Sequence, residues 1–321
     1  MSFLKTIRGG AAAAALALAA LPAAAQDWPA QPVTVLIPFS AGGGNDTVAR
    51  SMGTALEERL GVPFTPVNAP GAGGFVAAQR LVSGNADGYT VSHQSLGTFI
   101  LTSLMNEQQV NPLEDLEFVA QMAGLTSAVA VPADSDYATL DDLIAALQAS
   151  DGSMTWGHTG QGGFHHVNGV SLLDAIGAEA RDVPFKGSSA TRAAMLGGQV
   201  DYAILSSVNY LGFENEMRFL AFFSDEADAV LPDVPTVADL GLDMVTVQTP
   251  SVWVVPAGTD QAVIDTLSAA IEEVVATDAY RDELLSLGIT PTYRSGADIR
   301  RLVDERIGGW QDIIARVSAA Q

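Results

Sequence analysis

Two glycine-containing bends stand where the chain could bind an anion. "PFSAGGGND" (38–46) follows the apolar run "VTVLI", and "TGQGGFHH" (159–166) follows "MTWGH". Each bend leads into a helical pattern, and the bare N–H groups of a helix start attract anions through hydrogen bonds and the helix dipole. Glycine lets a ligand approach the backbone because it has no Cβ atom. The bends are therefore candidate anion sites, with simple tight turns as the alternative.

The bends do not match the common phosphate-binding patterns. In a G-x-G-x-x-G fingerprint starting at Gly42, the third glycine would fall on Thr47. The G-x-x-x-x-G-K-[ST] loop also fails, because Phe185 precedes Lys186, the one lysine beyond the N-terminal segment. Lys186 follows a predicted strand and precedes a predicted helix, which is where α/β folds place ligands. It could face an anionic ligand, or its position could be due to chance.

Residues suited to catalysis or to a metal centre are few. No serine lies in a G-x-S-x-G turn, and the chain has no cysteine. His158, His165 and His166 are close in sequence but lack H-E-x-x-H or H-x-x-x-H spacing, and adjacent helical residues point about 100° apart. We expect these histidines to lie on a helix surface or to line a pocket. The sequence predicts no enzyme, no cofactor and no metal.

Charge and the N-terminus limit the partners and the compartment. Residues 1–25 combine Lys5 and Arg8, an apolar run and small residues for cleavage, which is the order of a secretory signal. Cleavage near Ala25 would leave 13 basic and 37 acidic residues, a net charge of −24. This charge argues against nucleic acid or an anionic membrane as a partner. Without cysteine there are no disulfides, so we expect a periplasmic protein stabilised by its core.

Strand-like and helix-like segments alternate along the rest of the chain. Alternation with short connections predicts parallel sheets covered by helices, here in two α/β domains. We expect residues 26–124 with 246–321 to form the first domain, and residues 125–245 to form the second. The main predicted strands are 33–39, 117–123, 127–132, 154–159 and 245–256, and the main predicted helices are 45–60, 96–105, 139–150, 164–177, 259–277, 278–288 and 296–318.

Several segments resemble, in order, the tripartite tricarboxylate transporter substrate-binding proteins, also called the Bug family. The bend at 38–46 is similar to the P-F/W-x-x-G-G-x-x-D loop of that family, and "VNAPGAGG" and "DGYT" follow it. "TGQGGFHH" is similar to its second glycine loop, and "VPFKGSSATRAAMLGGQVD" and "LPDVPTVADLG" are similar to two later motifs. The resemblance covers nearly the whole mature chain, and together the motifs are highly specific.

The resemblance implies a fold like the type II periplasmic binding proteins, in which two α/β domains close on a ligand like a Venus flytrap. It also implies that backbone N–H groups and waters of the two glycine loops hold one carboxylate. Phe185 replaces the usual tyrosine, and "QGG" replaces a common Gly/Ser pattern, in the region expected to form the distal pocket. By motif position, the expected ligand-binding residues are Phe39, Ser40, Ala41, Gly42, Gly43, Gly44, Asp46, His93, Ser95, Thr159, Gly160, Gln161, Gly162, Gly163, Lys186, Gly187 and Ser188.

The resulting hypothesis is a monomeric periplasmic protein that binds a small carboxylate without converting it. It would deliver a di- or tricarboxylate, or a related organic acid, to the integral-membrane permease subunits of a tripartite tricarboxylate-type transporter. One alternative is a ligand-sensing module for a membrane signalling protein. Another is a periplasmic hydrolase or lyase that uses a histidine such as His93 or His166.

Overall fold

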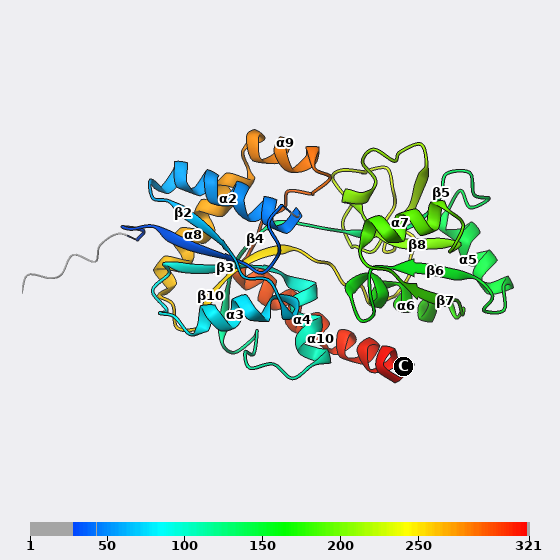
Figure 1. Ribbon diagram of the computed structural model, residues 1–321, viewed down its shortest axis with the longest axis horizontal. Helices are drawn as coiled ribbons and strands as arrows, with labels where there is room; N and C mark the ends of the chain where they lie inside the picture. Colours follow the sequence, from blue (N-terminus) through cyan, green and yellow to red (C-terminus); the bar gives the residue numbers. More distant parts are fainter. Residues whose placement is uncertain (1–27, 43, 320–321) are drawn as a thin grey trace, which may run out of the picture.

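The computed structural model describes residues 28–42 and 44–319, and it consists of two lobes that lie side by side (Figure 1). The predicted signal segment, its cleavage near Ala25 and the predicted site residue Gly43 lie outside the described residues. Within the described ranges, no helix is both long enough and apolar enough to cross a membrane.

The first lobe contains a six-stranded sheet with the order β11-β4-β10-β3-β1-β2. Its strands β1 and β10 are largely buried on both faces, as expected for a sheet that helices cover on each side, whereas the buried side chains of β3 include Ser92, His93 and Gln94. The strands are β1 (Val33–Ile37), β2 (Phe64–Asn68), β3 (Thr90–Ser95), β4 (Leu116–Ala123), β10 (Ser251–Pro256) and β11 (Arg294–Ser295).

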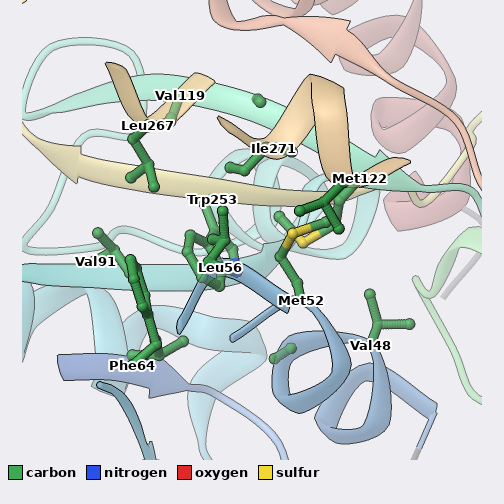
Figure 2. Close-up of a cluster of buried hydrophobic side chains, with 14 of the residues drawn as sticks. Val48, Met52, Leu56, Phe64, Val91, Val119, Met122, Trp253, Leu267 and Ile271 are labelled. Carbon is green, nitrogen blue, oxygen red and sulfur yellow. The ribbon is translucent and has the colours of Figure 1, made fainter. Parts of the chain in front are cut away.

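Helices cover both faces of the first sheet and form two hydrophobic cores. The core in Figure 2 joins α2 and α8 to one face, with Met52 and Leu56 of α2 near Trp253 of β10. The other core joins α3, α4 and α10 to the opposite face. The helices are α2 (Gly44–Leu60), the 3-10 turn η1 (Ala72–Gly74), α3 (Phe75–Val82), α4 (Leu96–Met105), α8 (Gln261–Val275), α9 (Asp278–Ser286) and α10 (Gly296–Ala319).

The second lobe repeats this layered plan around a five-stranded sheet with the order β7-β6-β8-β5-β9. Thr139 caps the first helix of this lobe, since its side chain accepts from the Asp142 N–H. The strands are β5 (Ser127–Pro132), β6 (Thr155–His158), β7 (Arg181–Pro184), β8 (Tyr202–Ser206) and β9 (Met217–Phe222), and the helices are α5 (Leu140–Ala149), α6 (Phe164–Ile176), α7 (Ser188–Leu196) and the 3-10 turn η2 (Ser207–Asn209).

The predicted α/β class is confirmed, but the prediction of parallel sheets is wrong in one respect. β10 runs antiparallel to both β3 and β4, and β5 runs antiparallel to both β8 and β9. Each of these two strands enters its sheet from the other lobe rather than through a helical crossover, so it arrives in the opposite direction. The first sheet takes its strands from 33–123 and 251–295 and the second from 127–222, while the exact domain boundaries stay a prediction.

The crossing segments between the lobes are held by a buried asparagine of α6. The Asn168 side chain accepts a hydrogen bond from the Val247 N–H (2.8 Å) and donates to the Val247 carbonyl oxygen (2.9 Å) and to Ser127 Oγ (2.8 Å). Asn168 therefore ties the returning segment to the beginning of β5. A second link joins the lobes along α10, which contacts α6 and whose Arg316 pairs with Asp174 of that helix.

We expect Asn168→Ala to lower the free energy of unfolding by about 2–4 kcal/mol, because it leaves several buried polar groups without partners. Urea unfolding measures this change. Asn85→Ala, at an exposed position, is the control and should change stability by less than about 0.5 kcal/mol. Equal effects of the two substitutions would contradict the role given to Asn168.

Candidate functional site

A cleft of about 490 Å³ lies between the two lobes. Four helices begin at this cleft, two from each lobe, because Gly44 opens α2, Ser95 caps α4, Phe164 opens α6 and Ser188 opens α7. The positive ends of four helix dipoles therefore meet around one space. The lining residues are Phe39, Gly42, Gly44, Asn45, Thr47, Ser95, Thr98, Leu125, Thr159, Phe164, His165, Ser188, Ser206, Val208, Asn209, Thr249, Leu287 and Ile289.

The cleft has an uncharged lining. No lysine, arginine, aspartate or glutamate occurs among its lining residues in the described part of the chain. The polar groups are hydroxyls, two asparagine amides, one histidine and the backbone of the glycine bend. Such groups can hold an anion through short hydrogen bonds, and a helix start strengthens each of them.

The first predicted loop, between β1 and α2, is only partly at the cleft. Phe39, Gly42 and Gly44 line it, whereas Ser40 and Ala41 are exposed outside the lining. Gly42 has a φ of +83°, which glycine adopts without strain, and this turns its N–H toward Asp46.

Asp46 lies behind the first loop and does not line the cleft. Its carboxylate accepts hydrogen bonds from the Gly42 N–H (2.8 Å), Arg50 Nε (2.8 Å) and Asn68 Nδ2 (2.7 Å). Asn68 Nδ2 also donates to the Phe39 carbonyl oxygen (2.9 Å). Burial by itself would raise the pKa of Asp46, but these hydrogen bonds and the Arg50 charge lower it to about 2. The charged carboxylate therefore fixes the shape of the loop.

His93 also lies behind the cleft, fully buried, with its Nε2 3.3 Å from Asn45 Oδ1. Burial lowers the pKa of His93 to about 3, although the Asp46 carboxylate acts in the opposite direction. Asn45 Oδ1 also accepts from Ser251 Oγ at 3.3 Å. With its oxygen occupied on both sides, Asn45 presents its amide nitrogen as a donor to the cleft.

The second predicted loop contributes Thr159 to the cleft and directs two of its N–H groups elsewhere. Gly162 N–H donates to His166 Nδ1 (3.0 Å), and Gly160 N–H donates to His158 Nδ1 (3.2 Å). Gln161 is exposed, and Gly160 to Gly163 are not among the lining residues. The structure thus brings the side chain of Thr159 to the cleft rather than the loop backbone.

His165 connects two hydroxyl groups of the second lobe. Its Nδ1 lies 2.7 Å from Thr159 Oγ1 and its Nε2 lies 3.0 Å from Ser206 Oγ. Burial, followed by the charge of His158, lowers the pKa of His165 to about 3, so the ring is neutral near pH 7. A neutral ring donates through one nitrogen and accepts through the other. One of the two hydroxyl groups therefore donates a hydrogen bond to the ring. The other accepts from the ring, so its own O–H can donate to a ligand in the cleft.

The third predicted segment, residues 186–188, lines the cleft with one residue. Ser188 lines it, while Lys186 is exposed and lies outside the lining, as does Gly187. Residues that the sequence reading did not propose include Asn45, Thr98, Ser206 and Thr249. Ser206 ends β8, so the rule that ligands bind at the carboxyl ends of strands could have identified it.

One cluster in the described residues has the composition of a metal site. His158 Nε2 and His166 Nε2 lie 3.1 and 3.6 Å from Asp182 Oδ2, and the three atoms lie within 4.8 Å of one another. The two imidazole rings are stacked, 4.4 Å apart with planes inclined by 23°, so their in-plane lone pairs do not converge. The N–H of Gly162 occupies Nδ1 of His166, which places the ring proton on Nε2. The cluster is therefore arranged for hydrogen bonding.

We expect Asp46→Asn to lower the free energy of unfolding by about 1–2 kcal/mol at pH 7. Because folding lowers the pKa of Asp46, its contribution is complete above about pH 4 and is lost as the pH falls toward 2. Urea unfolding between pH 7 and pH 2 should show the two proteins converging. Asp141→Asn, on the exposed side of α5, is the charge-matched control. A difference that does not change with pH would contradict this role.

Comparison with known proteins gives consistent matches. The pattern of the tripartite tricarboxylate transporter family receptor (TctC) matches residues 48–318. The "UPF0065 protein in gbd 5'region" of Cupriavidus necator is 30% identical over 317 residues, which cover 97% of this chain and 95% of the relative. A TctC solute binding protein from Polaromonas has the same fold with a TM-score of 0.81, at 23% identity over 90% of this chain and 99% of its own.

MatC from Rhodopseudomonas palustris, solved with bound malate, is 27% identical with a TM-score of 0.70, over 89% of this chain and 100% of its own. These matches confirm the resemblance, the two-lobed α/β class and the solute-binding role that the motifs predicted. The chain belongs to the tripartite tricarboxylate transporter receptor family, TctC.

Proposed function

We propose that the interlobe cleft binds a small organic carboxylate, which the protein passes to the permease subunits of a tripartite tricarboxylate-type transporter. The observation that carries this proposal is the meeting of four helix N-termini, with uncharged donors between them, in one cleft of about 490 Å³. The malate bound to the relative MatC supports the same chemical class. Export through a signal peptide cleaved near Ala25, and action as a monomer in the periplasm, belong to the same proposal.

The donors come from both lobes. The first lobe offers the Asn45 amide, Ser95 and Thr98, and the second offers Ser188 and one hydroxyl group of the pair Thr159 and Ser206. A carboxylate that accepts from both sets binds the closed arrangement better than the open one, and only such differential affinity can draw the lobes together. We propose Phe39, Gly42 and Gly44 as further contacts. The other predicted residues in the described ranges then act from behind the cleft or at its rim.

We propose binding without turnover. His165, the histidine of the cleft lining, has both ring nitrogens engaged by hydroxyl groups and a pKa far below neutrality, so it is a poor general base. The test is isothermal titration calorimetry with a panel of mono-, di- and tricarboxylates, followed by mass spectrometry of the released ligand. Stoichiometric release of intact ligand is the expected result. Conversion of the ligand, or no binding by any carboxylate, would overturn the proposal.

Ser95→Ala and Ser188→Ala should each weaken the affinity of the best carboxylate about tenfold, because each removes a hydroxyl donor to a charged group. Titration calorimetry measures the loss. Ser189→Ala is a matched control, since Ser189 is the exposed neighbour of Ser188 and lies outside the cleft lining. If all three variants bind like the wild type, the donors of the carboxylate lie elsewhere.

Lys186 stands two residues before Ser188, where its exposed side chain could reach a second carboxylate at the rim. We expect Lys186→Gln to weaken a dicarboxylate about threefold, and a monocarboxylate of equal length less, because an exposed ion pair contributes about 0.2–1 kcal/mol. Competition titrations at low and high salt measure the difference. Equal effects on both ligands would remove Lys186 from the binding site.

A further inference from the structure

Three histidines surround the loop 159–163, and only His165 faces the cleft. His158 ends β6 immediately before the loop, and His166 lies in the first turn of α6 immediately after it. Both are buried, with 0% and 4% of their surfaces exposed, and neither lines the cleft. The two rings stack on each other, and Trp156 stacks on His166 and packs at a tilt against His158, which holds both rings in fixed orientations.

Asp182 faces one nitrogen of each ring and favours a proton on it. Its Oδ2 lies 3.1 Å from His158 Nε2 and 3.6 Å from His166 Nε2. A carboxylate accepts hydrogen bonds, so it favours a proton on Nε2 of His158, and at the longer distance of 3.6 Å it attracts the Nε2–H group of His166 without a hydrogen bond. Nδ1 of His166 is then the acceptor for the Gly162 N–H (3.0 Å), whereas Nδ1 of His158 lies 3.0 Å from the Gly160 carbonyl oxygen and 3.2 Å from the Gly160 N–H and so contacts Gly160 in either tautomer.

The position of Gly162 also matters to the first lobe. Gly162 has a φ of +69°, and a Cβ built on it would lie 2.6 Å from Met105 Sδ, at the end of α4. The second loop is thus held between a ring of its own lobe and a side chain of the other lobe. A shift of Gly162 would change both the lobe contact and the direction of Thr159, which is three residues away and lines the cleft.

We propose that His158 and His166, oriented by Asp182, are positioning residues that fix loop 159–163 so that Thr159 faces the ligand. The inference rests on the proposed function for its effect on affinity, but the loop contact itself can be observed without ligand. Burial lowers the pKa of His166 to about 4, against the opposing effect of Asp182. The Nδ1 acceptor of His166 is therefore available throughout the neutral range.

Two substitutions of His166 separate the two ring nitrogens. In His166→Asn the amide oxygen can occupy the place of Nδ1 and accept from Gly162, whereas in His166→Gln the amide lies near the place of Nε2 and Nδ1 is lost. Both variants lose the stack on Trp156, so a purely structural role would affect them equally. Hydrogen exchange of the Gly162 amide, measured without ligand and relative to amides inside α6, reports the contact directly.

We expect Gly162 exchange to be at least tenfold faster in His166→Gln and nearly unchanged in His166→Asn. The affinity of the carboxylate chosen by titration should follow the same order, about tenfold weaker in the glutamine variant. Equal exchange in the two variants, or fast exchange without loss of affinity, would overturn the proposal. If the wild type binds no carboxylate while Gly162 exchange still separates the variants, the proposed function fails and the loop contact stands.

Asp182→Ala tests the same proposal at a half-exposed residue that is not part of the core. Without the carboxylate the Nε2 atoms lose the acceptor that favours their protons, and the amide of Gly162 should exchange several times faster. Asp141→Ala, at an exposed position on α5, removes an equal charge and should leave this amide unchanged. Unchanged exchange in Asp182→Ala would show that the carboxylate does not orient the rings and would overturn its part in the proposal.

Discussion

Each loop that shapes the cleft is held from behind by a partly buried polar network that contains one carboxylate. The Asp46 carboxylate accepts hydrogen bonds from Gly42, Arg50 and Asn68 behind the first loop. Asp182 hydrogen-bonds His158 and lies 3.6 Å from His166 Nε2, and these two rings contact the second loop. A buried polar network with all its partners is rigid, and one with a missing partner is costly, so each loop has a single well-defined shape before a ligand arrives. The rest of the site depends on this preorganisation.

The acidic surface and the uncharged cleft are compatible because they act at different distances. The formal charge of the whole chain is −22, whereas the cleft lining contains only neutral groups in the described residues. Helix N-termini and hydroxyl donors act within one hydrogen bond of the ligand, where a distant surface charge is screened. Ligand recognition can therefore be local, and the surface composition stays free to serve solubility.

The sequence predicted the elements and the two glycine bends well, because apolar periodicity and glycine position determine them locally. The direction of β5 and β10 could not be predicted, since a buried strand has the same pattern in either direction. The sequence also could not show which residues of each motif line the cleft and which lie behind it. Asp46 and His93 belong to matching motifs but lie behind the cleft, whereas Ser206 and Thr249 reach it from segments without a motif. Such placements follow from three-dimensional packing rather than from spacing along the chain.

The uncharged lining has a kinetic consequence for an anionic ligand. The approach to the cleft runs against the repulsive field of the whole molecule, and added salt shortens the reach of that field to about 10 Å at 0.1 M. Dissociation breaks short hydrogen bonds from uncharged donors inside the cleft, which salt affects little. The protein would thus capture its ligand faster in saltier surroundings while holding it for the same time, the reverse of a receptor that attracts anions with a cationic funnel.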